Sequence, residues 1–242
     1  MGLLKLQSVS KSYGALQVIH GVSFSVTEGE TLGILGPNGA GKTTLFNLIS
    51  GDVACDSGQV NYRGLDITKE PAHQRCRAGI GRSYQVPQPF GNMTVFENLV
   101  TAACFGGGQA EQEAWETAHQ VLGLTGLMSF ANKSAGSLTL LNRKRLELAR
   151  ALATRPQLLL LDEIAGGLTV YEAEELLQEL HRIKASGVTM IWIEHVVHAL
   201  LSIADRLLVI NFGTLLAQGK PAEVMADPEV QRVYMGLEVA AT

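Results

Sequence analysis

The chain has 242 residues, of which 46% are hydrophobic, and a formal net charge of -4. This length suffices for one large domain core, or for a core with a subdomain, and the negative charge offers no overall basic field to gather nucleic acid. Three cysteines lie far apart without a CxxC pair, which favours reduced intracellular thiols over a disulfide framework or a zinc site. The apolar runs are too short to span a bilayer and the N-terminus lacks a signal-peptide pattern, so we expect membrane contact only through a partner.

The N-terminal segment has the pattern of β-strands. Apolar residues alternate with polar ones at Leu4 and Leu6 and again over residues 22–26, which predicts half-buried antiparallel strands. Residues 31–35 form a nearly continuous apolar run, typical of a strand buried on both faces. A helix is predicted next, from Lys42 to about Ile49, with a glycine C-cap at position 51.

A glycine-rich loop joins that buried strand to that helix. Residues 36–43 match the pattern GxxxxGK[ST] without exception, in the strand–loop–helix context that the pattern requires. Glycines let main-chain N–H groups converge on phosphate oxygens, and the helix N-terminus adds partial positive charge. Lys42 can reach the β- and γ-phosphates, and the Thr43 hydroxyl can bind Mg²⁺. The loop therefore predicts a nucleoside triphosphate site, with ATP as the expected ligand, formed by Gly36, Pro37, Asn38, Gly39, Ala40, Gly41, Lys42, Thr43 and Thr44.

The middle of the chain differs in composition from both ends. Residues 86–154 contain two prolines, a glycine run at 106–108 that we expect to be flexible, and helical periodicity without a buried-strand run. We therefore predict a helical subdomain over 86–154, inserted into an α/β core made of residues 1–85 and 155–242.

Buried-strand character returns in the C-terminal part, at residues 158–161, 188–193 and 207–210. A helix is predicted between the first two, with Thr169 and Glu172 as a capping box. Strands that alternate with helices indicate a parallel sheet. The expected fold class is α/β, a P-loop NTPase core with a mainly parallel sheet, an antiparallel N-terminal β-subdomain and the inserted helices.

Two carboxylates follow the first of these strands. Asp162 and Glu163 come directly after the apolar run 158–161, at the strand end where α/β proteins bind ligands. Asp162 is expected to hold Mg²⁺, and Glu163 to orient the attacking water or accept its proton. An apolar run that ends in Asp-Glu is weak evidence alone, but it becomes strong beside the phosphate loop.

In this arrangement the sequence resembles an ATP-binding-cassette (ABC) ATPase, the nucleotide-binding subunit of a transporter, over nearly the whole chain. The resemblance implies that Tyr13 stacks on adenine, that Gln85 touches Mg²⁺ and the water, and that His195 contacts the γ-phosphate. It thus implies Glu163, His195 and Gln85 as catalytic residues, and Thr43, Gln85 and Asp162 as metal ligands.

The signature of that family departs here from its usual form. The family has LSGGQ at a helix N-terminus that caps the γ-phosphate of the ATP held by the opposite subunit, whereas this chain has Leu-Thr-Leu-Leu-Asn at 138–142. Two leucines replace glycines that would let the main chain approach a ligand. Ile164 and Thr169 also depart from the usual proline and aspartate near the dimer interface. The basic run 143–145 follows, and we interpret it as the solvated start of the signature helix rather than a nucleic-acid surface, since no aromatic residues interleave it.

Two further stretches narrow the resemblance. Residues 227–236, with a short amphipathic turn, and residues 92–99 resemble the ATPases of branched-chain amino acid uptake systems and their urea or amide relatives. The resemblance implies ATP hydrolysis that energises import, at the cytoplasmic face of the inner membrane. The implied partners are a second ABC ATPase, transmembrane permeases and, indirectly, a periplasmic substrate-binding protein.

Four alternatives stay open at this point. The altered signature favours a heterodimer of ATPases, but a homodimer is possible. The chain could instead belong to a non-transport ABC protein, although those usually carry two cassettes, long coiled coils or zinc insertions. A lipid or lipopolysaccharide exporter would keep the ATPase and change the cargo. A nucleotide-dependent binding module without hydrolysis is disfavoured because Glu163 is present.

Overall fold

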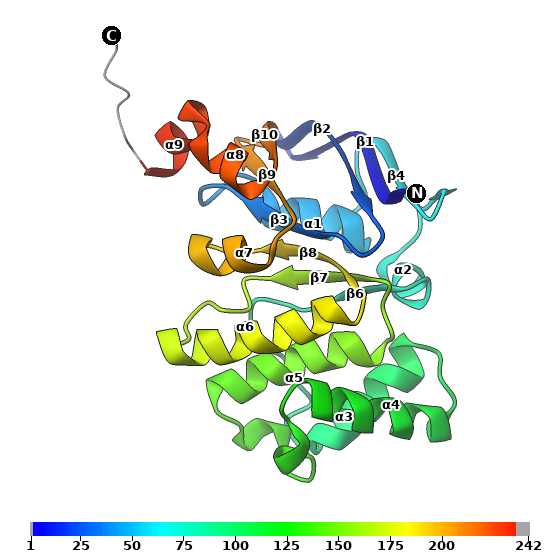
Figure 1. Cartoon of the computed structure of the whole chain (residues 1–242). Coiled ribbons are helices and arrows are strands. Elements are labelled where there is room, and N and C mark those ends of the chain that lie inside the picture. Colours follow the sequence, from blue (N-terminus) through cyan, green and yellow to red (C-terminus); the bar gives the residue numbers. More distant parts are fainter. Residues whose placement is uncertain (1, 236–242) are drawn as a thin grey trace. The chain divides into compact units, whose positions relative to one another are not determined.

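The computed structural model describes residues 2–235 and divides into two compact units. Unit 1 comprises residues 1–71 and 191–242, and unit 2 comprises residues 72–190. Strand β8 (Thr189–Ile193) crosses the boundary between the two stretches of chain. Along the chain, the N-terminal strands and the C-terminal elements therefore belong to unit 1, and the helix-rich middle belongs to unit 2 (Figure 1).

Unit 1 contains an antiparallel sheet with the strand order β2-β1-β4-β5. Its long strands β1 (Gly2–Tyr13) and β2 (Leu16–Thr27) pair with each other, and β4 (Ser57–Tyr62) pairs with β1 and with the short β5 (Leu65–Asp66). The alternating apolar residues of β1 and β2 are buried, which confirms the predicted half-buried antiparallel strands.

The phosphate loop also lies in unit 1, between a strand and a helix. Strand β3 (Thr31–Leu35) is buried at all five positions, as predicted. It pairs in parallel with β9 (Arg206–Asn211), which in turn pairs antiparallel with β10 (Thr214–Gly219). Helix α1 (Lys42–Ser50) ends at the predicted glycine C-cap, Gly51, whose φ of 82° is left-handed.

Among the described residues, unit 1 has three further helices: α7 (Val197–Ile203), α8 (Pro221–Ala226) and α9 (Pro228–Met235). Figure 1 shows α8 and α9 beside β9 and β10. The amphipathic turn predicted near the C-terminus falls in α9, where Val230 is buried, while residue 236 lies outside the described residues.

Unit 2 begins with α2 (Ala72–Arg77) and a short parallel pair, β6 (Ile80–Arg82) and β7 (Leu158–Asp162). All five residues of β7 are buried, as the apolar run predicts. Helix α6 (Val170–Ala185) starts with the predicted capping box of Thr169 and Glu172. Strand β6 was not predicted, because three residues are too few for a hydrophobic period to show.

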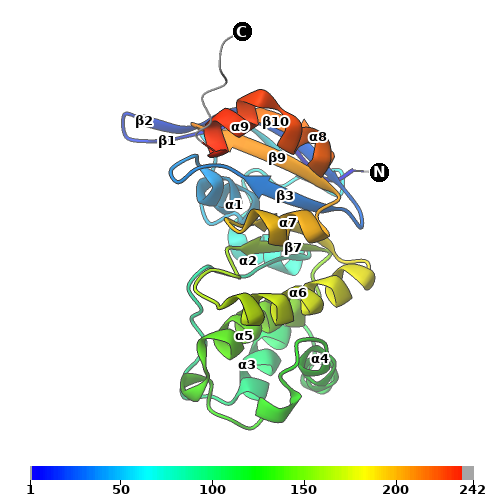
Figure 2. The same cartoon turned by 60° about the vertical axis from the view of Figure 1, so that its left-hand side comes forward.

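The remaining elements of unit 2 are helical. They are α3 (Val95–Thr101), the π-helical turn η1 (Ala102–Gly106), α4 (Glu111–Leu124), the 3-10 turns η2 (Met128–Phe130) and η3 (Ala135–Ser137), and α5 (Leu140–Ala153). Figure 2 shows α3, α4 and α5 packed together. The limits of the predicted subdomain, 86 and 154, stay a prediction.

Two of the three glycines at 106–108 have close packing neighbours, whereas a Cβ on the third, Gly108, would meet open space. A Cβ on Gly106 would lie 2.7 Å from the Thr154 side chain, and a Cβ on Gly107 would lie 2.8 Å from the carbonyl oxygen of Ala103. These two glycines therefore allow the π-helical turn to approach its neighbours closely. Within residues 2–235, none of the helices has the length and apolar character needed to cross a membrane.

Candidate nucleotide-binding and catalytic site

The phosphate loop of unit 1 is shaped by close main-chain approaches. A Cβ on Gly36 would lie 2.4 Å from the carbonyl oxygen of Ile210 in β9, and one on Gly41 would lie 2.9 Å from that of Val18. Gly41 also has a φ of 99°, and as the N-cap of α1 it makes no side-chain hydrogen bond to the helix. No side chain at this position therefore caps the first N–H groups of α1. An anion-binding helix N-terminus requires such N–H groups to point at the ligand.

The lysine of the loop is buried. Lys42 is 5% exposed, and its Nζ donates to the carbonyl oxygens of Gly36 at 2.7 Å and Pro37 at 3.0 Å. Asn38, Gly39 and Thr43 are exposed. The cradle fits a phosphate group, because only glycine can occupy its tightest positions and a cation lies inside it.

Two other predicted residues lie in unit 1. Tyr13, at the end of β1, is 47% exposed, and the Nζ of Lys11 lies 5.6 Å from its ring centre. His195 follows β8 and is exposed, while the buried carboxylate of Glu194 accepts its main-chain N–H at 2.9 Å. An accessible aromatic ring can stack on a base, and an exposed imidazole can hydrogen-bond to a phosphate.

The two predicted carboxylates lie in unit 2, at the carboxyl end of β7. Asp162 is 3% exposed and pairs with Arg82, whose Nη2 lies 3.1 Å from its Oδ2. The Gln85 side chain donates to Glu163 Oε2 at 2.5 Å, so the structure brings these two predicted residues together. Glu163 has a φ of 47°, an uncommon left-handed conformation for a residue with a side chain.

Arg82 and Lys144 contact this cluster, and neither was predicted to do so. The Nζ of Lys144 donates to the carbonyl oxygens of Gln85 at 3.3 Å and Glu163 at 3.0 Å, and the residue is only 5% exposed. The expectation of a solvated run at 143–145 is therefore wrong for Lys144, because main-chain carbonyl groups replace water around its ammonium group. Arg145 is also largely covered, since it pairs with Glu175 and Glu179 of α6. The apolar residues around Lys144 and Arg145 on α5 could have indicated burial, but not the groups that these two cations contact.

The altered signature forms the start of α5. Thr139 is the N-cap, and its hydroxyl accepts the N–H of Asn142 at 3.5 Å. Leu140 is 46% exposed, whereas Leu141 is buried. The exposed leucine therefore stands at a position where a family signature has a glycine.

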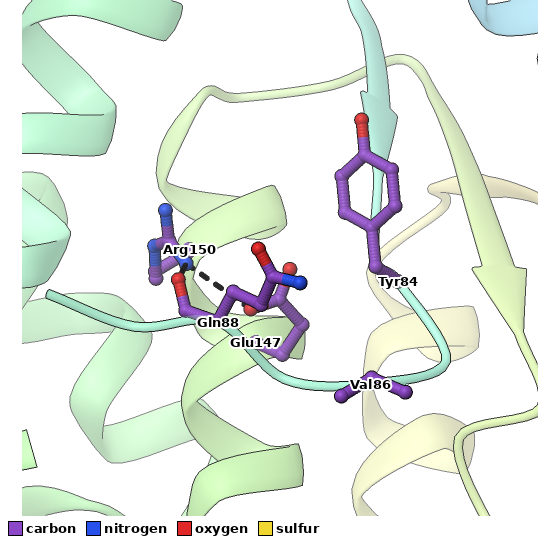
Figure 3. A pocket seen from close by; sticks show the side chains of 5 residues that line it. All are labelled: Tyr84, Val86, Gln88, Glu147 and Arg150. Atoms are coloured by element: carbon purple, nitrogen blue, oxygen red, sulfur yellow. Dashed lines mark hydrogen bonds and ion pairs between the residues drawn. The ribbon is translucent and has the colours of Figure 1, made fainter. Parts of the chain in front are cut away.

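A pocket of about 440 Å³ lies beside Gln85, wholly within unit 2. Tyr84, Val86, Gln88, Glu147 and Arg150 line it (Figure 3). Burial raises the pKa of the Glu147 carboxyl, although Arg150 and the main-chain N–H groups of Gln88 and Tyr84 act to lower it. The pocket thus combines exposed apolar side chains with a buried ion pair.

Comparison with known proteins gives this arrangement a family. A family model described as ABC transporter matches residues 19–166. The chain belongs to the ABC transporter family. Family membership confirms the resemblance stated from the sequence, and it makes this chain an ATPase of the ABC type. A second model, described as Branched-chain amino acid ATP-binding cassette transporter, matches residues 214–240.

Curated relatives align over almost the whole chain. The high-affinity branched-chain amino acid transport ATP-binding protein BraF of Pseudomonas aeruginosa is 35% identical, over 97% of this chain and 98% of that protein. The lipopolysaccharide export system ATP-binding protein LptB of Haemophilus influenzae is 33% identical, over 98% of each.

Solved structures confirm the predicted fold class. A nucleotide-free ATP-binding cassette from an ABC transporter superposes with a TM-score of 0.88 at 31% identity, covering 98% of this chain and 100% of the other. An ATP-binding cassette solved as a dimer in a post-hydrolysis state with ADP and phosphate gives a TM-score of 0.80 at 25% identity, covering 90% and 98%.

Gly36→Ala should abolish nucleotide binding, because the added methyl group would displace the loop from the Ile210 carbonyl. We expect the dissociation constant of a fluorescent ATP analogue to rise at least tenfold. Gly64→Ala is the control, since a Cβ at Gly64 would meet open space, and the positive φ of Gly64, 80°, adds backbone strain that Gly36 does not have. The control should lose about 1 kcal/mol of stability and keep its affinity. Equal affinities in both variants would contradict the role of Gly36.

Proposed function

We propose that this chain binds and hydrolyses ATP to energise the import of branched-chain amino acids or a related small solute. The observation that carries the cargo assignment is the C-terminal match at residues 214–240, because the matching model is described as a branched-chain amino acid cassette transporter. The similarity to BraF supports the same assignment. Lipopolysaccharide export is the second candidate, supported by the similarity to LptB.

Different residues would bind the base, the phosphates and the metal ion of the nucleotide. Tyr13 would stack on the base, and residues 36–44 would hold the phosphates through main-chain N–H groups and the Lys42 ammonium group. The Thr43 hydroxyl, the Gln85 amide and the Asp162 carboxylate are oxygen ligands of the kind that Mg²⁺ prefers. The bound metal would neutralise negative charge on the phosphates while the γ-phosphoryl group is transferred to water.

The hydrolytic step is assigned to three side chains. Glu163 would orient the attacking water and accept its proton, and Gln85 supports that role because its side chain already donates to the carboxylate. His195 would donate a hydrogen bond to the γ-phosphate as negative charge develops there. In this assignment the Gln85 side chain contacts both the metal and the attacking water.

Transport would require partners that this chain does not contain. We assign the pocket beside Gln85 to a permease segment, because Tyr84 and Val86 expose apolar surface next to a catalytic loop. Such docking would place the chain on the cytoplasmic face of the inner membrane, where a periplasmic binding protein delivers solute from the other side.

A second ATPase subunit would complete each nucleotide site. Leu140 exposes its side chain at the helix N-terminus that caps the partner's ATP in the family, so it would keep the main chain away from that phosphate. We therefore favour a heterodimer, in which an intact signature from another cassette caps the ATP held by this chain.

Glu163→Gln should keep ATP binding and lower the hydrolysis rate by about 10²- to 10⁴-fold, as expected when a general base is removed. The measurement is steady-state phosphate release, beside the dissociation constant of an ATP analogue. Glu174→Gln, at an exposed position of α6, is the matched control and should hydrolyse ATP normally. Hydrolysis by Glu163→Gln at the wild-type rate would exclude Glu163 as the base.

Deletion of the gene should lower the uptake of labelled leucine, isoleucine and valine at least tenfold in whole cells. Wild-type chain should restore uptake, and Glu163→Gln should not. Unchanged amino acid uptake together with loss of surface lipopolysaccharide would reject import and favour the export alternative.

The purified chain alone should show weak ATPase activity that rises without cooperativity in ATP concentration. Mixing it with a cassette that carries an intact LSGGQ signature from the same transporter should raise the rate per site at least tenfold. Fast, cooperative hydrolysis by the chain on its own would instead support a homodimer.

A further inference from the structure

Three charged side chains of α5 hold the main chain of the loop 84–88. The Lys144 Nζ donates to the carbonyl oxygen of Gln85 at 3.3 Å. The Glu147 carboxylate accepts the main-chain N–H groups of Tyr84 and Gln88. The Arg150 Nη1 donates to the carbonyl oxygen of Gln88 at 2.8 Å. The loop is thus bound at both ends and at Gln85 by one helix.

These contacts are largely buried, so the distances and angles between their charged groups and the main chain are restricted. Lys144 and Glu147 are only 5% and 6% exposed, and Arg150 Nη1 lies 3.1 Å from Glu147 Oε2. Figure 3 shows Glu147 and Arg150 converging on the chain at Gln88. Buried charges are tolerated only with hydrogen-bonded partners, and charge-assisted hydrogen bonds are the strong ones. The position of the loop relative to α5 is therefore closely fixed.

Two side chains of the loop are exposed. Tyr84 is 48% exposed and Val86 is 65% exposed, although both are apolar or aromatic. The helix thus holds main-chain groups of the loop, while the Tyr84 and Val86 side chains stay exposed. This division lets the outer face of the loop suit a partner while its path stays the same.

One of the three side chains, that of Lys144, contacts a second segment as well. Lys144 also donates to the carbonyl oxygen of Glu163 at 3.0 Å, where the main chain has its left-handed φ of 47°. The same ammonium group therefore joins the loop that carries Gln85 to the residue whose carboxylate Gln85 contacts. A strained backbone conformation persists only when its surroundings hold it.

We propose that Lys144, Glu147 and Arg150, here called the α5 clamp, are positioning residues for ATP hydrolysis. The clamp keeps Gln85 and Glu163 in register, and it makes the loop 84–88 move as one body with the signature helix. In this proposal the three residues act through Gln85 and Glu163 and not by contact with the nucleotide or the attacking water. The proposal rests on the roles assigned to Gln85 and Glu163 in the proposed function.

Lys144→Met tests the clamp by separating the turnover rate from binding. We expect kcat for ATP to fall at least tenfold, while KM and the dissociation constant of an ATP analogue change less than threefold. Lys133→Met removes the same charge at an exposed position of unit 2 and should match the wild type. Wild-type kcat in Lys144→Met, with Glu163→Gln inactive, would overturn the clamp and leave the proposed function standing. If Lys144→Met does not fold, Lys144→Gln is measured against the same outcomes.

A double-mutant cycle distinguishes positioning from general damage. In a Gln85→Ala background, Lys144→Met should lower kcat by a smaller factor than it does in the wild type, because one of the two residues that it positions has already lost its side chain. A full tenfold loss in that background would show that Lys144 acts independently of Gln85, against the proposal.

Amide hydrogen exchange tests the clamp without a measurement of ATP hydrolysis. Glu147→Met removes the acceptor of two main-chain N–H groups, so the amides of Tyr84 and Gln88 should exchange at least tenfold faster. Glu116→Met, at an exposed position of α4, is the control and should leave both rates unchanged. Unchanged exchange in Glu147→Met would overturn the clamp. The exchange rates do not depend on the role of Glu163. Wild-type ATP hydrolysis by Glu163→Gln would therefore reject Glu163 as the base, and the exchange rates of Glu147→Met would still test the clamp.

Discussion

The ammonium group of Lys144 joins three segments of unit 2 through two carbonyl groups. It extends from α5 and contacts the main chain at Gln85 and at Glu163. Because the cation is buried away from water, loss of these oxygens would leave its charge unsolvated, at a large cost in free energy. The two residues whose side chains meet, Gln85 and Glu163, are therefore both held at the main chain by one ammonium group. The helix that directly precedes β7 thus contacts the main chain at the carboxyl end of that strand.

A similar reliance on the main chain holds in unit 1. The phosphate loop approaches β9 so closely that a methyl group at Gly36 would overlap the Ile210 carbonyl. The helix α1 starts at Gly41 without a side-chain cap, which leaves the helix N-terminus to a ligand. Both units thus fix functional side chains through backbone contacts. Exposed side chains, such as Tyr13 in unit 1 and Val86 in unit 2, are then available to ligands and partners.

Much of the fold could be predicted from the sequence, since periodicity and caps are local signals. The strands at 31–35 and 158–161, the glycine at position 51 and the capping box at Thr169 were all found in this way. The candidate site was predictable where a motif has a fixed spacing. Lys144 was missed because a basic residue in a basic run suggests solvent, and only long-range packing reveals its carbonyl partners. Arg82 was missed because its partner Asp162 lies 80 residues away.

The two units supply different chemistry, and the proposed reaction needs both on one nucleotide. Pulsed electron–nuclear spectroscopy with Mn²⁺ in place of Mg²⁺, ATP and ¹³C-carboxyl-labelled aspartate measures this directly. If Asp162 and the phosphate loop share one metal, the spectrum contains couplings to ³¹P and to ¹³C, and Asp162→Asn removes the ¹³C coupling. A ³¹P coupling accompanied by a ¹³C signal that Asp162→Asn leaves unchanged would contradict a shared site.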